Sequence, residues 1–199
     1  MRYRARLPAK PPGDTLPAMA GSYAVLTAIG ADRVGIVDDL SGLVAARACN
    51  IEESRMAVLG GEFAVIMLVS GEPPALDQLS SELAATGARL GLHVQLKATR
   101  GPRVEAGRPY LLETVSLDTP GIVHTVTAAL RKHGVNIESL ETDTAAAPWT
   151  GAPMFRMRAH VVIGPAVEIG KLKDDLAHLE AGQDLDVRLR PVFPVPETE

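Results

Sequence analysis

Short apolar runs and amphipathic stretches follow each other in a fixed order along most of the chain. The runs YAVLTAIG (23–30) and YLLETVSL (110–117) are rich in residues that favour strands. After each run, apolar residues recur at offsets of 0, 1, 4, 7 and 8, which is the spacing of one helix face. These residues are Ile36, Val37, Leu40, Leu43 and Val44 in the first stretch, and Ile122, Val123, Val126, Ala129 and Leu130 in the second.

Two further strands are predicted after each helix, at 50–60, 62–70, 136–144 and 154–163. In the last of these, Phe155, Met157, Ala159, Val161 and Ile163 alternate with Arg156, Arg158 and His160. This alternation predicts a strand with one buried face. Residues 62–70 are apolar on both faces, so we expect a partner copy or a second chain to cover their outer side.

A second helix and a final strand complete each set. The helices are predicted from leucines three and four residues apart, namely Leu76, Leu79 and Leu83, and Leu172, Leu176 and Leu179. The final strands are expected at 92–98 and 185–192. The order βαββαβ therefore occurs twice. It predicts an α+β protein with two ferredoxin-like units, each a four-stranded antiparallel sheet with two helices on one face.

The two sets are copies of each other. A shift of 86 residues aligns Asp32 with Asp118, Gly35-Ile36-Val37 with Gly121-Ile122-Val123, and Asn50-Ile51-Glu52 with Asn136-Ile137-Glu138. The predicted organisation is a basic, Pro-rich disordered tail (1–21), a first domain (22–99), a linker (100–109), a second domain (110–192) and a C-terminal tail (193–199). An organelle transit peptide, or translation that starts at Met19, are alternative explanations for the first segment.

Composition and charge narrow the function classes. The 199 residues are 46% hydrophobic and 22% charged, which is enough for a buried core, and no run is long and apolar enough for a membrane span. The formal charge is −4, and because the first 21 residues carry four basic and one acidic residue, the remainder carries −7. This balance is unsuitable for a nucleic-acid surface. We expect a soluble, cytoplasmic protein that does not bind nucleic acid or membrane directly.

Metal and catalytic signatures are missing from the sequence. Cys49 is the single cysteine, which excludes an internal disulfide and a Cys-based metal site, and its apolar context predicts a small buried residue. None of the five histidines forms a zinc-protease or hydrolase motif. His124 and His133 align with Asp38 and Arg47, which indicates exposed helix positions. We expect no enzyme activity, no cofactor and no metal.

The repeated Asp-x-x-Gly motif lies where a strand turns into a helix. Gly35 and Gly121 are expected in the first helical turn, where a missing side chain leaves backbone N–H groups open to an anion such as a carboxylate. Thr119 and Pro120 resemble an N-cap followed by proline at the first helical position. One glycine per copy does not make a phosphate loop. The alternative is that the motif is only a helix cap.

The repeated Asn-Ile-Glu motif opens the second strand of each copy. The side-chain amides of Asn50 and Asn136 both donate and accept hydrogen bonds, which suits an amino acid's ammonium and carboxylate. The alternative is that both are only turn residues.

The segments DRVGIV and CNIEESRMAVLGGEFAVIMLVSG, with DTPGIV and GVNIESLETDT, resemble the ACT domain, a regulatory amino-acid-binding module. The tandem arrangement over residues 22 to about 192 is similar to the glycine cleavage system transcriptional repressor family. The resemblance implies that a small amino acid binds at domain interfaces. The implied contacts are Asp32, Gly35, Ile36, Asn50 and Ile51 in the first copy, and Asp118, Gly121, Ile122, Asn136 and Ile137 in the second.

The resemblance also implies a partner and a working hypothesis. The family is thought to bind a DNA-binding activator protein rather than DNA. We therefore expect a non-catalytic homodimer that senses a small amino acid, with glycine as a candidate, and that modulates a transcription factor or an enzyme. The alternatives are an interaction regulator without a ligand, and a regulatory subunit of an amino-acid metabolic enzyme.

Two departures from the family pattern bear on the expected sites. Val34 stands where proline is common, so the first turn is less pre-organised than the second. The second copy inserts residues 145–153 between two strands, and this loop carries Trp149, a candidate partner or ligand contact.

Overall fold

The computed structural model divides the chain into two compact units, Met1–Arg103 (unit 1) and Val104–Glu199 (unit 2). The described residues are 22–102, 106–147 and 150–192. The expected tails and Trp149 lie outside the described residues.

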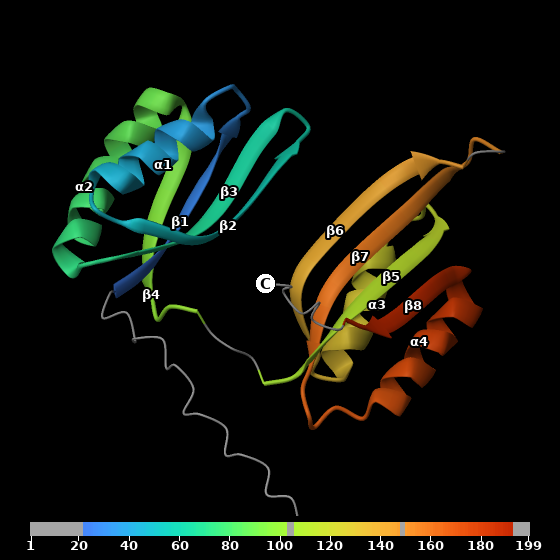
Figure 1. Cartoon of the computed structure of the whole chain (residues 1–199). Coiled ribbons are helices and arrows are strands. Elements are labelled where there is room, and N and C mark those ends of the chain that lie inside the picture. The colour runs from blue at the N-terminus through green and yellow to red at the C-terminus, as the bar shows by residue number, and fades with distance from the viewer. Residues whose placement is uncertain (1–21, 103–105, 148–149, 193–199) are drawn as a thin grey trace, which may run out of the picture. The chain divides into compact units, whose positions relative to one another are not determined.

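Unit 1 has the predicted element order. Its elements are β1 (Ser22–Ala31), α1 (Ile36–Ala46), β2 (Asn50–Leu59), β3 (Glu62–Gly71), α2 (Pro73–Leu90) and β4 (Leu92–Thr99). The strands form one antiparallel sheet in the order β2-β3-β1-β4. Both helices lie on one face of it (Figure 1). The predicted ferredoxin-like fold is therefore confirmed for this unit.

Unit 2 repeats the arrangement. Its elements are β5 (Arg108–Leu117), α3 (Ile122–Lys132), β6 (Asn136–Ala146), β7 (Pro153–Ile163), α4 (Ile169–Gln183) and β8 (Leu185–Pro191). The sheet order is β6-β7-β5-β8, again antiparallel, with both helices on one face (Figure 1). The duplication seen in the sequence is thus a duplication of the complete fold.

Each first helix is held to its sheet by a single apolar stripe. The buried positions are Ile36, Leu40 and Val44 in α1, and Ile122, Val126 and Leu130 in α3. Val37 and Val123, which the sequence pattern placed on the same face, are 43% and 37% exposed. The stripe is narrower than predicted because a helix lying on a sheet buries only the side chains that point at the strands.

Two boundaries in unit 2 differ from the prediction. β6 continues to Ala146, which pairs with Pro153 at the start of β7, so the predicted inserted loop at 145–153 is shortened by strand pairing at both ends. β5 begins at Arg108, which pairs with Ile163, so the strand starts inside the predicted linker. In both places the hydrogen-bonded ladder continues through residues whose types do not favour a strand.

The sheet faces that point away from the helices differ between the units. In unit 1 this face carries Ile29 and Ile66, which are 51% and 49% exposed. In unit 2 it carries Glu113, whose carboxylate lies 3.8 Å from Arg158 and 3.2 Å from Arg190. Val115 and Leu117 on the same face of unit 2 are also exposed, so the outer face of the first sheet is apolar at Ile29 and Ile66, whereas that of the second mixes apolar side chains with an ion-paired carboxylate. A cover over the outer face of the first sheet remains a prediction.

The buried hydroxyl of Thr114 in β5 is a weak point of the unit 2 core. Thr114 is 0% exposed, and its Oγ1 has no hydrogen-bond partner among the described residues. We expect Thr114→Val to raise the free energy of unfolding by about 1 kcal/mol, because valine has nearly the same shape and no unsatisfied polar atom. Thermal denaturation checks this, with the partly exposed Thr27→Val in β1 as the control. A lower melting temperature for Thr114→Val would contradict the prediction.

Candidate functional site

The turn between the first strand and the first helix has the same geometry in both units. Gly35 and Gly121 are the N-cap residues of α1 and α3, with φ of 92° and 98°, and neither helix start has a side-chain cap. The predicted N-cap at Thr119 with Pro120 at the first helical position is therefore wrong. The positive φ at Gly121 makes the chain turn there, so the helix begins only at Ile122.

Each turn is fixed to the tip of the neighbouring hairpin. The backbone N–H of Asp32 donates to the carbonyl of Gly61 at 2.9 Å, and that of Asp118 donates to Pro153 at 3.0 Å. The carbonyl of Gly121 accepts the first helical hydrogen bond from Thr125 at 3.0 Å. The N–H groups of the first helical turn have no partner within the helix, so they remain available to an external acceptor.

The two helix starts carry different charges. In unit 1 the first turn of α1 contains Asp38 and Asp39, and Arg33 pairs with Asp39 at 2.8 Å. In unit 2 the first turn of α3 contains no acidic residue, and Asp118 lies just before it. The α3 start is therefore better suited to an anionic group than the α1 start.

Ile36 and Ile122 are poor candidates for side-chain contacts. They are 2% and 4% exposed and belong to the cores of their units. Only their backbone N–H groups can face a ligand at the turn.

The start of the second strand contains a bulge in both units. The pairing register shifts between Ile51 and Glu53 in unit 1, and between Ile137 and Ser139 in unit 2. The repeated Asn-Ile-Glu motif thus places a glutamate, Glu52 or Glu138, at the unpaired position. The motif specifies a local backbone shape as well as a polar side chain.

In unit 1 this bulge carries a polar cluster that the sequence analysis missed. Asn50 Nδ2 donates to Glu52 Oε1 at 3.1 Å, and Ser70 Oγ donates to the same carboxylate. These two hydrogen bonds hold the pKa of the Glu52 carboxyl below its usual range, with the Ser70 contribution the larger. The position opposite Asn136 is Val162, so unit 2 lacks the hydroxyl. The repetition of the glutamate was the signal that could have identified the cluster.

The predicted contacts form two groups at opposite ends of each sheet. Asn50 pairs with Ser70, which pairs with Tyr23 near the start of β1, whereas the turn follows Ala31 at its end. Ala31 lies eight residues after Tyr23 in the strand, a separation of about 26 Å at 3.3 Å per residue. Within one unit, a small ligand cannot reach both the turn and the asparagine.

Cys49 and Arg47 have structural roles. Cys49 is buried, and burial raises the pKa of its thiol, which leaves little reactive thiolate. In unit 1, Arg47 pairs with Glu82 and joins α1 to α2. His124 is exposed, as predicted.

The prediction that His133 is exposed is wrong. Its side chain is 12% exposed, because Nε2 contacts Asp175 Oδ2 at 2.7 Å between α3 and α4. Hydrogen bonds from Lys132 and then His133 lower the pKa of Asp175. Among the described residues, no group of three or more His, Cys, Asp or Glu side chains is placed to hold a metal ion.

Known proteins are similar to this chain in sequence. The ACT domain model matches residues 22–97. A glycine cleavage system transcriptional repressor of Escherichia coli strain K12 is 39% identical over 123 residues, covering 61% of this chain and 65% of that protein. The chain therefore matches slightly less than two thirds of the length of that repressor. A UPF0237 protein of Methanopyrus kandleri is 42% identical over 73 residues, which cover 36% of this chain and 81% of that protein.

The same likeness holds in three dimensions. The crystal structure of an unknown protein from Galdieria sulphuraria has a TM-score of 0.72 and 34% identity, covering 87% of this chain and 99% of that chain.

Among the described residues, none of the helices has the length and apolar character that a bilayer crossing requires.

Proposed function

Since this chain belongs to the ACT-domain proteins, with two such units in tandem, and resembles the glycine cleavage system transcriptional repressors, we propose that it is an amino-acid-responsive regulator. In this proposal a small amino acid, with glycine as the first candidate, binds at an interface between ACT domains. Binding changes how the chain engages a protein partner, which we propose to be a transcriptional activator of glycine cleavage genes. A regulatory role without catalysis agrees with the relatives.

The observation that carries the proposal is the turn of unit 2. The α3 start offers backbone N–H groups that can bind a carboxylate, and its first turn contains no competing acidic residue. Asp118 stands beside it and can accept hydrogen bonds from an ammonium group. These two features together suit the two charged ends of an α-amino acid.

The separation of the two groups of contacts bears on the assembly. A site that combines a turn with the asparagine of a strand start has to take them from different ACT domains, because about 26 Å separates them within one unit. We therefore propose that the complete site forms between domains in a homodimer. Ligand binding would then be coupled to association, which is how a small molecule can alter the binding of a protein partner.

We expect calorimetric titration of the full chain with glycine and the other common amino acids to detect binding of at least one of them. Asp118→Asn should weaken that binding by about tenfold, because it removes the charge that holds the ammonium. Asp32→Asn is the matched control in unit 1, where the acidic first turn of α1 disfavours the carboxylate, and it should leave the affinity within about twofold of wild type.

Two outcomes would contradict this proposal. Absence of binding by any amino acid would favour a regulator that acts by protein interaction alone, for which the apolar outer face of unit 1, with Ile29 and Ile66, is a suitable contact surface. Equal loss of affinity in Asp118→Asn and Asp32→Asn would mean that the ligand does not prefer the unit 2 turn over the unit 1 turn.

A further inference from the structure

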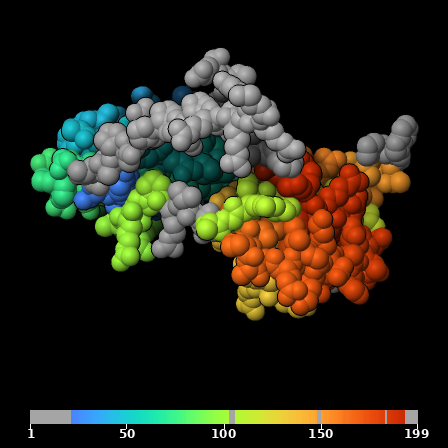
Figure 2. All heavy atoms as spheres, turned by 60° about the horizontal axis from the view of Figure 1, so that its bottom comes forward, coloured from blue at the N-terminus to red at the C-terminus, as the bar shows by residue number. Residues whose placement is uncertain are grey.

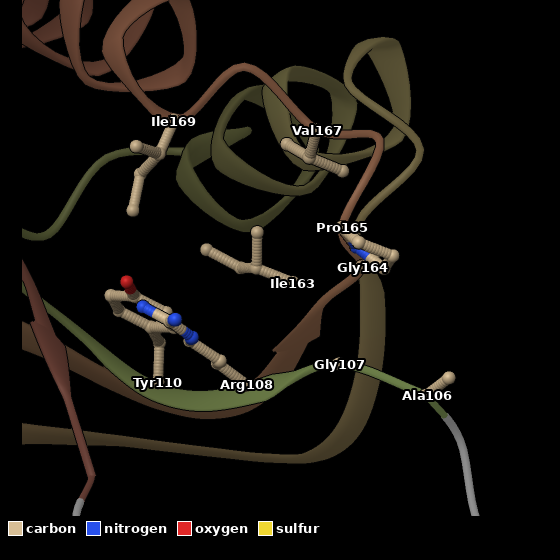
Figure 3. Close-up of a pocket in the computed structure, with 9 residues that line it drawn as sticks. All are labelled: Ala106, Gly107, Arg108, Tyr110, Ile163, Gly164, Pro165, Val167 and Ile169. Atoms are coloured by element: carbon tan, nitrogen blue, oxygen red, sulfur yellow. The ribbon is translucent and has the colours of Figure 1, made fainter.

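Unit 2 contains a cavity of about 420 Å³ at the end of the sheet opposite the turn. The start of β5, the end of β7 and the β7–α4 connection form its walls (Figure 3). Figure 2 shows the yellow-green atoms at the start of β5 at the surface of unit 2, against the orange atoms of the segment that follows β7. The lining residues Gly107, Arg108 and Pro165 are exposed, so the cavity opens to solvent, and its volume suits a small molecule.

The cavity exists because α4 begins late. In unit 1, β3 ends at Gly71 and α2 starts at Pro73, whereas in unit 2 β7 ends at Ile163 and α4 starts only at Ile169. Unit 2 thus replaces the first turn of the second helix with a short connection through Gly164 and Pro165. The missing turn leaves the space beside the first residues of β5 open.

Arg108 and Tyr110 give this space its chemistry. They lie two residues apart on β5, so their side chains are on the same face, and both line the cavity (Figure 3). Arg108 is exposed and has no ion-pair or hydrogen-bond partner in the described part of the chain. The 86-residue shift places Ser22 and Ala24 at these positions in unit 1. The guanidinium and the phenol that line the cavity of unit 2 therefore have no counterpart at the matching positions of unit 1.

The other walls are apolar. Ile163, Val167 and Ile169 face the space, and none of the lining residues is an aspartate or a glutamate (Figure 3). A guanidinium binds a carboxylate through two parallel hydrogen bonds, and a phenol can donate a third. The lining provides no side-chain carboxylate for an ammonium group.

From this geometry we propose that the cavity is a second ligand site, which takes a small carboxylate with an apolar side chain and no ammonium group, such as a branched 2-oxo acid. Arg108 and Tyr110 hold the carboxylate, and Ile163, Val167 and Ile169 contact the apolar portion. The site is independent of the proposed amino-acid site, because Arg108 begins β5 and Asp118 follows its end. The ten residues of β5 place them about 30 Å apart.

Titration calorimetry on the full chain tests the proposal, with 4-methyl-2-oxopentanoate as the probe and leucine as its ammonium-bearing counterpart. We expect the oxo acid to bind, and leucine to bind at least about tenfold more weakly at this site, because its ammonium is left without a partner. Arg108→Gln should weaken binding of the oxo acid by about tenfold or more. Arg156→Gln is the matched control, since Arg156 is an exposed arginine on the other face of the same sheet, and it should change the affinity by less than about twofold.

A second variant distinguishes binding inside the cavity from binding to the exposed arginine alone. Val167→Phe places a larger side chain in the space and should abolish binding while Arg108 is retained. Thermal denaturation of each variant without ligand verifies that it is folded. The proposal is overturned if wild type does not bind the oxo acid at millimolar concentration, or if folded Arg108→Gln binds as tightly as wild type. Loss of amino-acid binding in Asp118→Asn leaves these results unaffected, so the two sites are tested separately.

Discussion

Leu40→Ala is expected to lower the free energy of unfolding of unit 1 by about 2–5 kcal/mol. Leu40 is 0% exposed and lies at the centre of the buried stripe of α1, between Ile36 and Val44. Alanine at this position removes the central apolar contact between the helix and the sheet and leaves a cavity that close-packed neighbours cannot fill. A loss of this size is comparable to much of the stability of a small domain.

Urea denaturation of the full chain measures the loss, and hydrogen exchange of the amides in α1 and β1 assigns it to unit 1. Val37→Ala is the matched control, because Val37 lies on the same helix but is 43% exposed, and it should cost less than about 0.5 kcal/mol. Equal losses for the two variants would contradict the assignment of α1's buried face to one narrow stripe.

The fold was predictable because its two periodicities are strong. Alternation in β7 and the spacing of three and four residues between leucines in α2 each fit a single kind of element. The duplication then supplied two readings of every element, at a shift of 86 residues through the second strand and at larger shifts after the inserted loop. A feature weak in one copy was visible in the other, and the order βαββαβ followed.

The details that the sequence did not predict depend on tertiary contacts. His133 is fixed by Asp175, which is distant in the sequence, so its burial has no local signal. The pairing of Ala146 with Pro153 follows from the length of the neighbouring strand. Thr119 and Pro120 have the residue types of a helix start, but the positive φ at Gly121 places the start later.

The sequence identified the residues of the candidate site but not their positions relative to one another. The turn residues and the strand-start residues were both identified from the repeats, yet only strand register shows that they lie at opposite ends of each sheet. The cavity at Arg108 had no sequence signal, because it results from a helix that starts several residues later than its counterpart in unit 1. A helical turn that is missing from one copy leaves no motif in the sequence.

Gly35→Ala and Gly121→Ala are each expected to lower the free energy of unfolding by about 2 kcal/mol. At φ of 92° and 98° a side chain is strained by its own backbone. A Cβ at Gly121 would meet no other atom within 4 Å, so the cost is conformational rather than a clash.

Gly42→Ala is the control that shows whether the loss of stability depends on the positive φ of the turn glycines. Gly42 lies inside α1, it has no positive φ, and a Cβ there also meets nothing within 4 Å. Alanine should therefore stabilise the helix by about 0.5–1 kcal/mol, the opposite sign to the turn variants. Denaturant unfolding measures the change in the free energy of unfolding for all three variants.

If the turn variants were as stable as wild type, the left-handed conformation would not be required. The helix starts would then not be rigid enough to hold N–H groups in place for a carboxylate. A loss at both turns together with a gain at Gly42 would identify the repeated glycine as the residue that keeps both helix starts open.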